Sequence, residues 1–452
     1  MRVAVISDIH SNYYAFKAVV NHAISQNVNC FIFLGDYVSD LANPLKTMDL
    51  LYDLQSKYLT YCLRGNRERY MIEYDETKVG FNYGSETGSL LYTYDNLRSK
   101  DISFFKSLKM YDIIEIDGVK IEIAHASKDN DRYNFDNNSS KINDIFKQMT
   151  TNYLLTGHCH KQYSNTYLNK TIINPGSVGV PQDRNWFSKY AILDIEDGNV
   201  THTFYKVSYD IEKTIYSQFS SNLMNYSKYW SIGILYDIIT GDNWVLNLLE
   251  NVYIKSKKPT ENDWYISAKE LGMKFTEKEL LEITFKYKVL SMKKILVIGC
   301  PGSGKSTFSR KLSKVLNMPV YHLDNMNWNA DKTTVPKIVF IERLQETMQK
   351  DCWIIDGNYN STMEMRFKEC DTVFFLEYSL ETCLDGVMQR KGKFREDMPW
   401  IEEEIDEEFI QFIKEFNIVS KPKILEIINR YQDKNLYVFK TREDADEFLN
   451  KI

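Results

Sequence analysis

Two short apolar stretches, each running into a polar turn, constrain most strongly how this chain can fold. The first is Arg2–Asp8 and the second is Lys294–Gly299. Both have the length and the β-branched content of buried strands. Helical patterns such as Tyr14–Gln26 follow, so we expect an α/β fold rather than an all-β one. Met292 stands just ahead of the second stretch, which suggests a fusion of two proteins.

The length of 452 residues predicts two or three domains, because a single hydrophobic core of that size is unusual. We expect a first domain over 1–210, a helical cap or connector over 211–290, and a last domain over 292–452. In the middle segment apolar residues recur at helical spacing, and Thr260-Glu-Asn-Asp263 has a capping-box pattern.

Strand patterns are concentrated in the first domain. Asp117-Gly118 is typical of the tight turn of a hairpin between two of them. The expected strands are Val3–Ile6, Cys30–Leu34, Tyr58–Leu63, Ile113–Ile116, Val119–Ala124, Tyr153–Thr156, Thr171–Ile173 and Tyr190–Asp194.

Composition excludes several classes of protein. Hydrophobic residues make up 43% and charged residues 26%, and the net charge of −6 disfavours non-specific binding to nucleic acid. The seven cysteines are scattered without a C-x-x-C pair, which argues against a disulfide framework or a structural zinc site. Val3–Ile6 is too brief for a signal peptide, and no stretch approaches the ~20 apolar residues of a membrane span. We therefore expect a cytoplasmic protein with no membrane partner; its oligomeric state stays open.

Acids, an amide and histidines follow the apolar strands of the first domain. Because loops at the carboxyl ends of parallel strands converge on one edge, these groups are expected to lie together. They are Asp8-Ile9-His10, Gly35-Asp36, Gly65-Asn66, His125 and Gly157-His158-Cys159-His160.

The residue types point to metal binding. Imidazoles, carboxylates and an amide oxygen form a mixed set that suits Mn, Fe, Zn or a similar divalent ion. A carboxylate can bridge two ions ~3.5–4 Å apart, and such a pair binds phosphate oxygens and generates hydroxide. Lone histidines such as His22 and His202 are instead interpreted as structural.

These five motifs, closed by Asn174-Pro-Gly-Ser-Val-Gly179, resemble the calcineurin-like metallophosphoesterase superfamily over residues 1–205. The resemblance implies a two-sheet sandwich with helices outside. It also implies two metal sites with one bridging ligand. By this resemblance Asp8, His10 and His160 hold one ion, Asn66, His125 and His158 hold the other, and Asp36 bridges them.

One position departs from the family pattern. The family usually has a histidine after the asparagine, where this chain has Arg67. A guanidinium cannot donate a proton at neutral pH, but it can hold a phosphate oxygen. Our hypothesis is that Arg67, with Arg64, binds phosphate and that leaving groups needing protonation react slowly. Glu68 either orients a ligand or pairs with Arg64.

The second half opens with a complete phosphate-loop pattern between a predicted strand and a helical run, Thr307–Leu316. In such a loop backbone N–H groups cradle phosphates, Lys305 reaches the β and γ oxygens, and Ser306 binds Mg²⁺. The expected nucleotide-binding residues are Gly299, Pro301, Gly302, Ser303, Gly304, Lys305, Ser306 and Thr307.

Further residues of this half are candidates for the acceptor side. Asp356 ends a buried strand and suits either a Mg²⁺-water role or an acceptor-side role, and Asp324 with Trp328 follows another strand. Arg390 and Arg395 flank a short basic turn that either closes over a transferred phosphoryl group or is a solvated loop.

Residues 292–452 resemble the adenylate-kinase-like P-loop kinases, in particular the group named DNA topology modulation proteins. The resemblance rests on the phosphate loop, Asp324 with Trp328, Asp356-Gly-Asn-Tyr359, Arg366 and the Arg390/Arg395 turn. It implies a five-stranded parallel sheet of the P-loop NTPase type, with ATP and Mg as donor. Adenylate kinases carry an arginine shortly after their Asp-Gly; here Asn360 stands there and Arg366 is the nearest candidate. The leading acceptor is a nucleoside monophosphate.

The sequence thus predicts a bifunctional enzyme acting on small phosphorylated substrates and ATP. One half hydrolyses phosphoesters with two metals, and the other transfers phosphate from ATP. Two alternatives stay open. The chain could process nucleic-acid ends, which the acidic charge disfavours, or the P-loop half could sense nucleotide and regulate the phosphoesterase.

Overall fold

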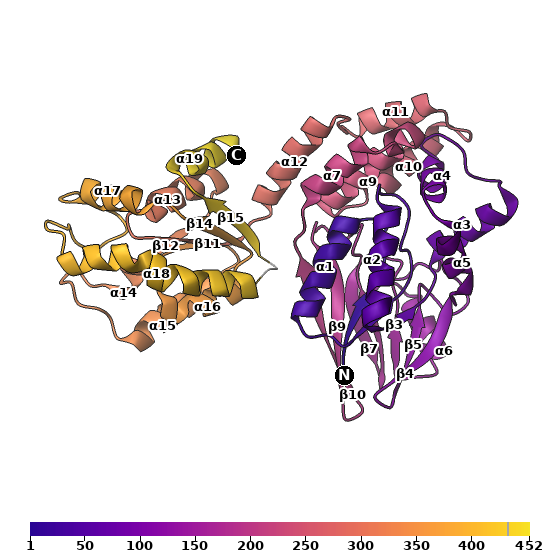
Figure 1. Ribbon diagram of the computed structural model, residues 1–452, viewed down its shortest axis with the longest axis horizontal. Coiled ribbons are helices and arrows are strands. Elements are labelled where there is room, and N and C mark those ends of the chain that lie inside the picture. Colours follow the sequence, from indigo (N-terminus) through magenta and orange to yellow (C-terminus); the bar gives the residue numbers. More distant parts are fainter. Residues whose placement is uncertain (432–433) are drawn as a thin grey trace. The chain divides into compact units, whose positions relative to one another are not determined.

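A computed structural model describes residues 1–431 and 434–452 (Figure 1). The chain forms two compact units, Met1–Phe285 and Lys286–Ile452. Each unit combines strands with flanking helices, which confirms the α/β prediction.

The first sheet of the N-terminal unit has the strand order β10-β9-β1-β2-β3. Strands β1, β2 and β3 are parallel to one another, and β9 is antiparallel to both of its neighbours, β1 and β10. The carboxyl ends of β1, β2 and β3 therefore lie on the same edge of the sheet. The bounds are β1 (Arg2–Ile6), β2 (Cys30–Phe33), β3 (Leu59–Cys62), β9 (Ser188–Glu196) and β10 (Asn199–Val207), with α1 (Tyr13–Ser25) and α2 (Pro44–Lys57) as connections.

The second sheet has the order β4-β5-β6-β8-β7, in which β5, β6 and β8 are parallel. Asp117 and Gly118 have φ values of 47° and 76° between β4 and β5, as expected for the predicted hairpin turn. The bounds are β4 (Tyr111–Ile116), β5 (Val119–Ala124), β6 (Tyr153–Leu155), β7 (Gln162–Tyr167) and β8 (Lys170–Pro175), with α6 (Ile142–Gln148) before β6.

The two sheets pack face to face over an aliphatic core. Val3 and Ile32 of the first sheet belong to one buried cluster with Ile121 and Ile173 of the second. Because successive side chains of a strand point to opposite faces, the neighbouring Phe31 faces the helices instead. This alternation holds the two sets of strand ends close together.

The middle segment shares the core of the N-terminal unit. Ile215, Leu235 and Trp264 lie in the same buried cluster as Phe16 of α1 and Phe33 of β2. The remaining helices within residues 1–290 are α3 (Asn66–Thr77), α4 (Gly88–Asp95), α5 (Ser99–Ser107), α7 (Ile211–Ser220), α8 (Leu223–Tyr226), α9 (Lys228–Thr240), α10 (Trp244–Lys255), α11 (Glu261–Glu270) and α12 (Glu277–Leu290). The predicted capping box starts α11, where Thr260 and Asp263 bond reciprocally.

The C-terminal unit contains a five-stranded sheet of order β12-β13-β11-β14-β15, in which every pair is parallel. Its strands are β11 (Lys294–Gly299), β12 (Val320–His322), β13 (Trp353–Asp356), β14 (Thr372–Leu376) and β15 (Asn435–Phe439). Its helices are α13 (Lys305–Leu316), α14 (Leu323–Asn327), α15 (Lys337–Met348), α16 (Asn360–Glu369), α17 (Leu380–Arg390), α18 (Glu407–Arg430) and α19 (Arg442–Lys451).

All eight strands expected in the first domain form, but β7 and β10 were not expected. Both lie at the edge of a sheet, and β7 reads Gln-Tyr-Ser-Asn-Thr-Tyr, with no apolar stretch to reveal it. An edge strand has one paired side only and is held by a neighbour rather than by its own hydrophobicity.

Asp237 of α9 carries a pH-dependent contribution to stability. It is fully buried, and its Oδ1 accepts a hydrogen bond from the N–H of Val245 at 2.9 Å. Burial raises the pKa of Asp237 well above its usual value, although the hydrogen bonds to α10 oppose the shift. Above the unfolded pKa of ~3.9 the native protein holds more protons than the unfolded chain, so the free energy of unfolding falls as pH rises.

We therefore predict that Asp237→Asn flattens the fall in stability with pH. Asparagine keeps the acceptor oxygen but does not titrate. The melting temperature of the variant minus that of the wild type should increase from pH 5 to pH 8, measured by circular dichroism. Asp129→Asn, at an exposed position away from α9, is the control and should show no such trend. A difference in melting temperature between Asp237→Asn and the wild type that stays constant with pH would contradict the prediction.

Candidate functional site

Loops from both sheets of the N-terminal unit bring the predicted metal ligands together. Asp8 follows β1, Asp36 follows β2, and Asn66 begins α3 after β3. From the second sheet, His125 follows β5 directly, and His158 with His160 follows β6. The convergence that was expected at the strand ends is therefore present in the structure.

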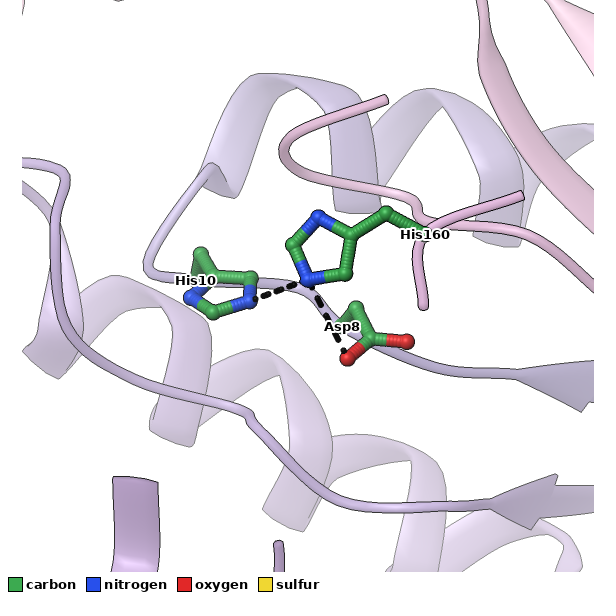
Figure 2. A group of neighbouring side chains, drawn as sticks. All are labelled: Asp8, His10 and His160. Atoms are coloured by element: carbon green, nitrogen blue, oxygen red, sulfur yellow. Dashed lines mark hydrogen bonds and ion pairs between the residues drawn. The ribbon is translucent and has the colours of Figure 1, made fainter. Parts of the chain in front are cut away.

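The first group consists of Asp8, His10 and His160, whose candidate ligand atoms all lie within 4.8 Å of one another. The Nε2 atoms of His10 and His160 are 3.1 Å apart, and His160 Nε2 is 3.5 Å from Asp8 Oδ1 (Figure 2). Figure 2 shows the two rings and the carboxylate pointing toward a common centre. This is the geometry of a three-ligand site for one ion.

The second group consists of Asp36, His125 and His158 and obeys the same 4.8 Å limit. Asp36 Oδ2 is 3.4 Å from His125 Nε2 and 3.8 Å from His10 Nε2, so it reaches ligands of both groups. A single carboxylate oxygen between two sets of ligands is suited to bridging two ions.

Several ligand atoms are buried without a hydrogen-bond partner. They are Asp8 Oδ1, Asn66 Oδ1 and His125 Nε2. A buried polar atom left unpaired costs free energy, and native structures rarely tolerate several in one place. Buried oxygen and imidazole donors of this kind fit divalent cations, which would satisfy such atoms.

The other ring nitrogen of three histidines is anchored to a hydrogen-bond acceptor. His10 Nδ1 is 3.0 Å from Asp40 Oδ2, His125 Nδ1 is 2.8 Å from the carbonyl of Leu34, and His160 Nδ1 bonds the carbonyl of Val180. A proton on each Nδ1 leaves the lone pair of Nε2 free for a metal. These three hydrogen-bond acceptors thus favour the histidine tautomer that can bind a metal through Nε2.

The backbone at the ligands is strained. Asp8, His10, Asp36, His158 and His160 all have positive φ values between 49° and 65°. Side-chain-bearing residues seldom adopt this conformation, and clusters of it are typical of functional sites. Here all five residues with this backbone conformation are predicted metal ligands, and they lie in loops that follow strands.

Electrostatics keep the carboxylates ionised. Burial alone would raise the pKa of Asp8, but His160 outweighs it and lowers this pKa to about 2. Burial opposes protonation of His125, yet Asp36 raises the pKa of His125 to about 10. Burial and the charge of His125 lower the pKa of His158 to about 4. The buried carboxylates are therefore negatively charged and are stabilised by positive charge nearby, which metal ions bound between them would supply.

Arg67 lies beside the second strand's loop. Its backbone N–H donates to Asp36 Oδ1 at 2.8 Å, and its Nη2 is 3.1 Å from Asp40 Oδ2. The side chain is 20% exposed, so part of the guanidinium remains accessible. Arg64 lies between β3 and α3, and its Nε is buried without a hydrogen-bond partner.

Sequence reasoning missed Asp40 and left the role of Glu68 open. Glu68 accepts hydrogen bonds from the N–H groups of Asp36, Tyr37 and Gly65, each at 2.8 Å, and so holds two loops together. Among the described residues no ion pair joins it to Arg64. The only signal for Asp40 was a second carboxylate four residues after Asp36.

In the C-terminal unit the predicted phosphate loop joins β11 to α13. Lys305 Nζ donates to the carbonyls of Gly299 and Cys300 at 2.9 and 3.0 Å. The side-chain amide of Asn358 also donates to the carbonyl of Gly299, at 2.7 Å. Gly302 has a φ of 82°, and a Cβ there would lie 2.0 Å from the carbonyl of Cys383. Only glycine fits this position.

A cavity of 1180 Å³ opens beside the loop. Every residue expected at the nucleotide or acceptor side lines it, except Gly299 and Arg366. These lining residues are Pro301, Gly302, Ser303, Gly304, Lys305, Ser306, Thr307, Asp324, Trp328, Asp356, Arg390 and Arg395. Arg366 is fully buried and donates to the carbonyls of Gly357 and Asn358, which gives it a role in shaping the loop after β13.

Several polar and charged residues that line the cavity already have side-chain partners. Ser306 Oγ donates to Asp397 Oδ2 at 2.9 Å, and Asp356 accepts from His322 at 2.8 Å. Arg390 Nε is 3.1 Å from a carboxylate oxygen of Glu402. Burial lowers the pKa of Lys305 and raises that of Asp324. Asp397 and Glu402 were not anticipated from the sequence.

Comparison with known proteins bears on the N-terminal unit. Residues 1–198 match the profile of the calcineurin-like phosphoesterase superfamily domain. These residues form a calcineurin-like metallophosphoesterase domain. The match and the two ligand groups assign metal-dependent phosphoester hydrolysis to this domain.

Individual relatives are distant. The chain is 29% identical over 231 residues to the uncharacterized protein MJ0912 of Methanocaldococcus jannaschii, covering 47% of this chain and 89% of that protein. It is 24% identical over 239 residues to a replication protein of onion yellows phytoplasma, covering 48% and 58%. The solved metallophosphoesterase from Sphaerobacter thermophilus is 23% identical with a TM-score of 0.40, covering 48% of this chain and 92% of that one.

In the part of the chain that the structure describes, every helix is too short or too polar to traverse a lipid bilayer.

Gly157 allows the first metal group to form. A Cβ at this position would lie 2.0 Å from Ser7 Oγ and 2.9 Å from Asp8 Oδ2. Gly157→Ala should therefore displace Asp8 and weaken Mn²⁺ binding roughly 10-fold, the usual scale for losing support behind a metal ligand. Binding can be measured by isothermal titration calorimetry, with circular dichroism to confirm the fold.

Ser7→Ala provides the matched control, because Ser7 Oγ has no hydrogen-bond partner to lose. Adding Ser7→Ala to Gly157→Ala removes the closest clash and should restore most of the affinity. Unchanged Mn²⁺ binding in Gly157→Ala alone would show that the close packing is not needed.

Proposed function

We propose that the N-terminal domain hydrolyses phosphomonoesters or diesters with two divalent metal ions. Asp8, His10 and His160 hold one ion, Asn66, His125 and His158 hold the other, and Asp36 is shared. The observation that carries this assignment is the position of Asp36 Oδ2, within 3.8 Å of imidazole nitrogens from both groups. When bound, such a pair of ions binds phosphate oxygens and supplies hydroxide for in-line attack; Mn, Fe and Zn suit these ligands.

Arg67 determines which leaving groups can depart readily from this site. Asp40 and Asp36 hold its guanidinium beside the bridging carboxylate, in the position where the family usually has a histidine. A guanidinium can stabilise the negative charge of the phosphate oxygens but cannot protonate a departing alkoxide. Phosphate esters of acidic alcohols should react faster than esters of simple alcohols, because the oxygen of an acidic alcohol can leave without being protonated.

Wild-type protein should hydrolyse p-nitrophenyl phosphate far faster than ethyl phosphate, and Arg67→His should narrow that gap. Histidine beside Asp40 would be a general acid, which typically contributes 10²–10⁴-fold. We expect at least a 10-fold narrowing of the ratio of kcat/KM values. Arg67→Gln, which removes the charge without adding an acid, should leave the ratio wide. Equal rates for both esters in the wild type would refute this role.

We further propose that the C-terminal unit binds ATP with Mg²⁺ and transfers phosphate to a small acceptor. In support, the phosphate-loop motif lies between a parallel strand and a helix N-terminus, at the wall of a 1180 Å³ cavity. Lys305 and Ser306 would contact the nucleotide phosphates and Mg²⁺. Asp324, Trp328 and Asp356 would face the acceptor, with a nucleoside monophosphate as the leading candidate.

Arg390 and Arg395 would neutralise charge on the transferred group. Both now lie near Glu402, with Arg395 Nη2 at 3.7 Å from its Oε2. Exchange of this carboxylate for phosphate oxygens would redirect both guanidinium groups toward the nucleotide.

The two activities should separate by mutation. Lys305→Ala should abolish ATP–Mg²⁺ binding in calorimetry and leave hydrolysis of p-nitrophenyl phosphate unchanged, whereas Asp36→Asn should do the reverse. Lys314→Ala, at an exposed position of the same helix, is the control for Lys305. Undiminished ATP binding in Lys305→Ala would contradict the nucleotide assignment.

Two further assays of the wild-type protein test the alternatives. ATP binding without turnover, together with an altered rate of phosphoester hydrolysis, indicates that the C-terminal unit is a nucleotide sensor. Phosphorylation of 5′-hydroxyl oligonucleotides indicates end processing of nucleic acid.

A further inference from the structure

Asp40 connects the candidate metal centre to its surroundings through both carboxylate oxygens. Oδ2 accepts from His10 Nδ1 at 3.0 Å and from Ser39 Oγ at 3.0 Å, and it lies 3.1 Å from Arg67 Nη2. Oδ1 instead accepts from the indole N–H of Trp230 at 2.9 Å. The side chain is only 1% exposed, so water does not stabilise its charge.

Trp230 comes from α9, outside residues 1–198 that match the phosphoesterase domain. Two side chains of α7 reach the same loops. Gln218 Nε2 donates to the carbonyl of Asp40 at 3.1 Å, and Thr214 Oγ1 donates to Asn12 Oδ1 at 3.1 Å. The middle helices therefore contribute polar contacts to the metal-site loops, in addition to apolar packing.

We propose that Trp230 is a positioning residue of the metal centre, acting through Asp40 on His10 and Arg67. The inference rests on the function proposed above. A carboxylate can turn about its Cβ–Cγ bond, and the indole N–H on Oδ1 holds Asp40 in the one rotation that directs Oδ2 to both partners. Removing that donor leaves a buried charged oxygen unpaired, which costs more than the loss of an ordinary hydrogen bond.

A packing role would make a different prediction from a positioning role. Trp230 also lies against Trp264, with ring centroids 6.4 Å apart and an interplanar angle of 70°. Phenylalanine retains most of such a contact but has no N–H. Trp230→Phe thus separates the hydrogen bond from the packing, and Trp264→Phe makes the same change of size in the same cluster without touching Asp40.

The test uses the full chain with Mn²⁺ alone and with inorganic phosphate as an inhibitor. Calorimetry gives the Mn²⁺ affinity, and hydrolysis of p-nitrophenyl phosphate gives kcat, KM and the inhibition constant for phosphate. We expect Trp230→Phe to weaken Mn²⁺ binding about 10-fold, in the range measured for lost outer-shell partners. The inhibition constant for phosphate should rise as well, because Arg67 loses its alignment, whereas Trp264→Phe should match the wild type.

A double-mutant cycle shows whether Trp230 acts through Asp40. In an Asp40→Ala background, which removes both carboxylate oxygens, Trp230→Phe should have no further effect on Mn²⁺ affinity. An equal loss in both backgrounds, or a Trp230→Phe protein within twofold of the wild type, overturns the inference. Should phenylalanine impair folding, 3-benzothienylalanine at position 230 replaces the N–H by sulfur with the ring shape kept, and the same outcomes apply.

Failure of the underlying function gives a different result. Wild-type protein that binds no Mn²⁺ overturns the proposed two-metal function and this inference with it. Wild-type protein that binds Mn²⁺ while Trp230→Phe binds it equally well overturns the positioning role alone.

Discussion

The buried carboxylate of Asp36 is the constraint around which the N-terminal unit is arranged. Its Oδ2 lies between imidazoles that come from different sheets, and it is only 2% exposed. A buried anion among further anions is stable only where positive charge is bound nearby. The strained backbone at Asp8 and His160 and the unpaired ligand atoms have the same explanation, since each directs an oxygen or a nitrogen at this centre.

An outer layer of contacts holds these ligands in place. Glu68 ties the loops after β2 and β3 through backbone N–H groups, and Asp40 connects His10 with Arg67. The middle helices complete this layer, because α9 reaches Asp40 through Trp230 and shares the apolar core behind the first sheet. The helical segment is therefore a structural part of the unit that contains the metal centre.

Much of this arrangement could be predicted from the sequence because ligands and strands are local patterns. Asp8, Asp36 and His125 each follow an apolar stretch, and the parallel pairing of those stretches brings their ends together. The edge strands β7 and β10 could not be found in the same way, since polar residues fill much of β7 and pairing with neighbours holds both. The chemistry of the phosphate loop was equally local, whereas the commitment of Arg366 to backbone carbonyls was not.

The sequence by itself determined which residues have metal-binding and phosphate-binding chemistry and where they follow a strand. The reason is that hydrophobic periodicity and loop motifs depend on neighbours along the chain. Only the tertiary structure decided what stands behind each ligand: that Asp40 is shared by His10 and Arg67, and that Trp230, some 190 residues further on, is hydrogen-bonded to it. Such pairs depend on the packing of distant segments, and no local pattern records it.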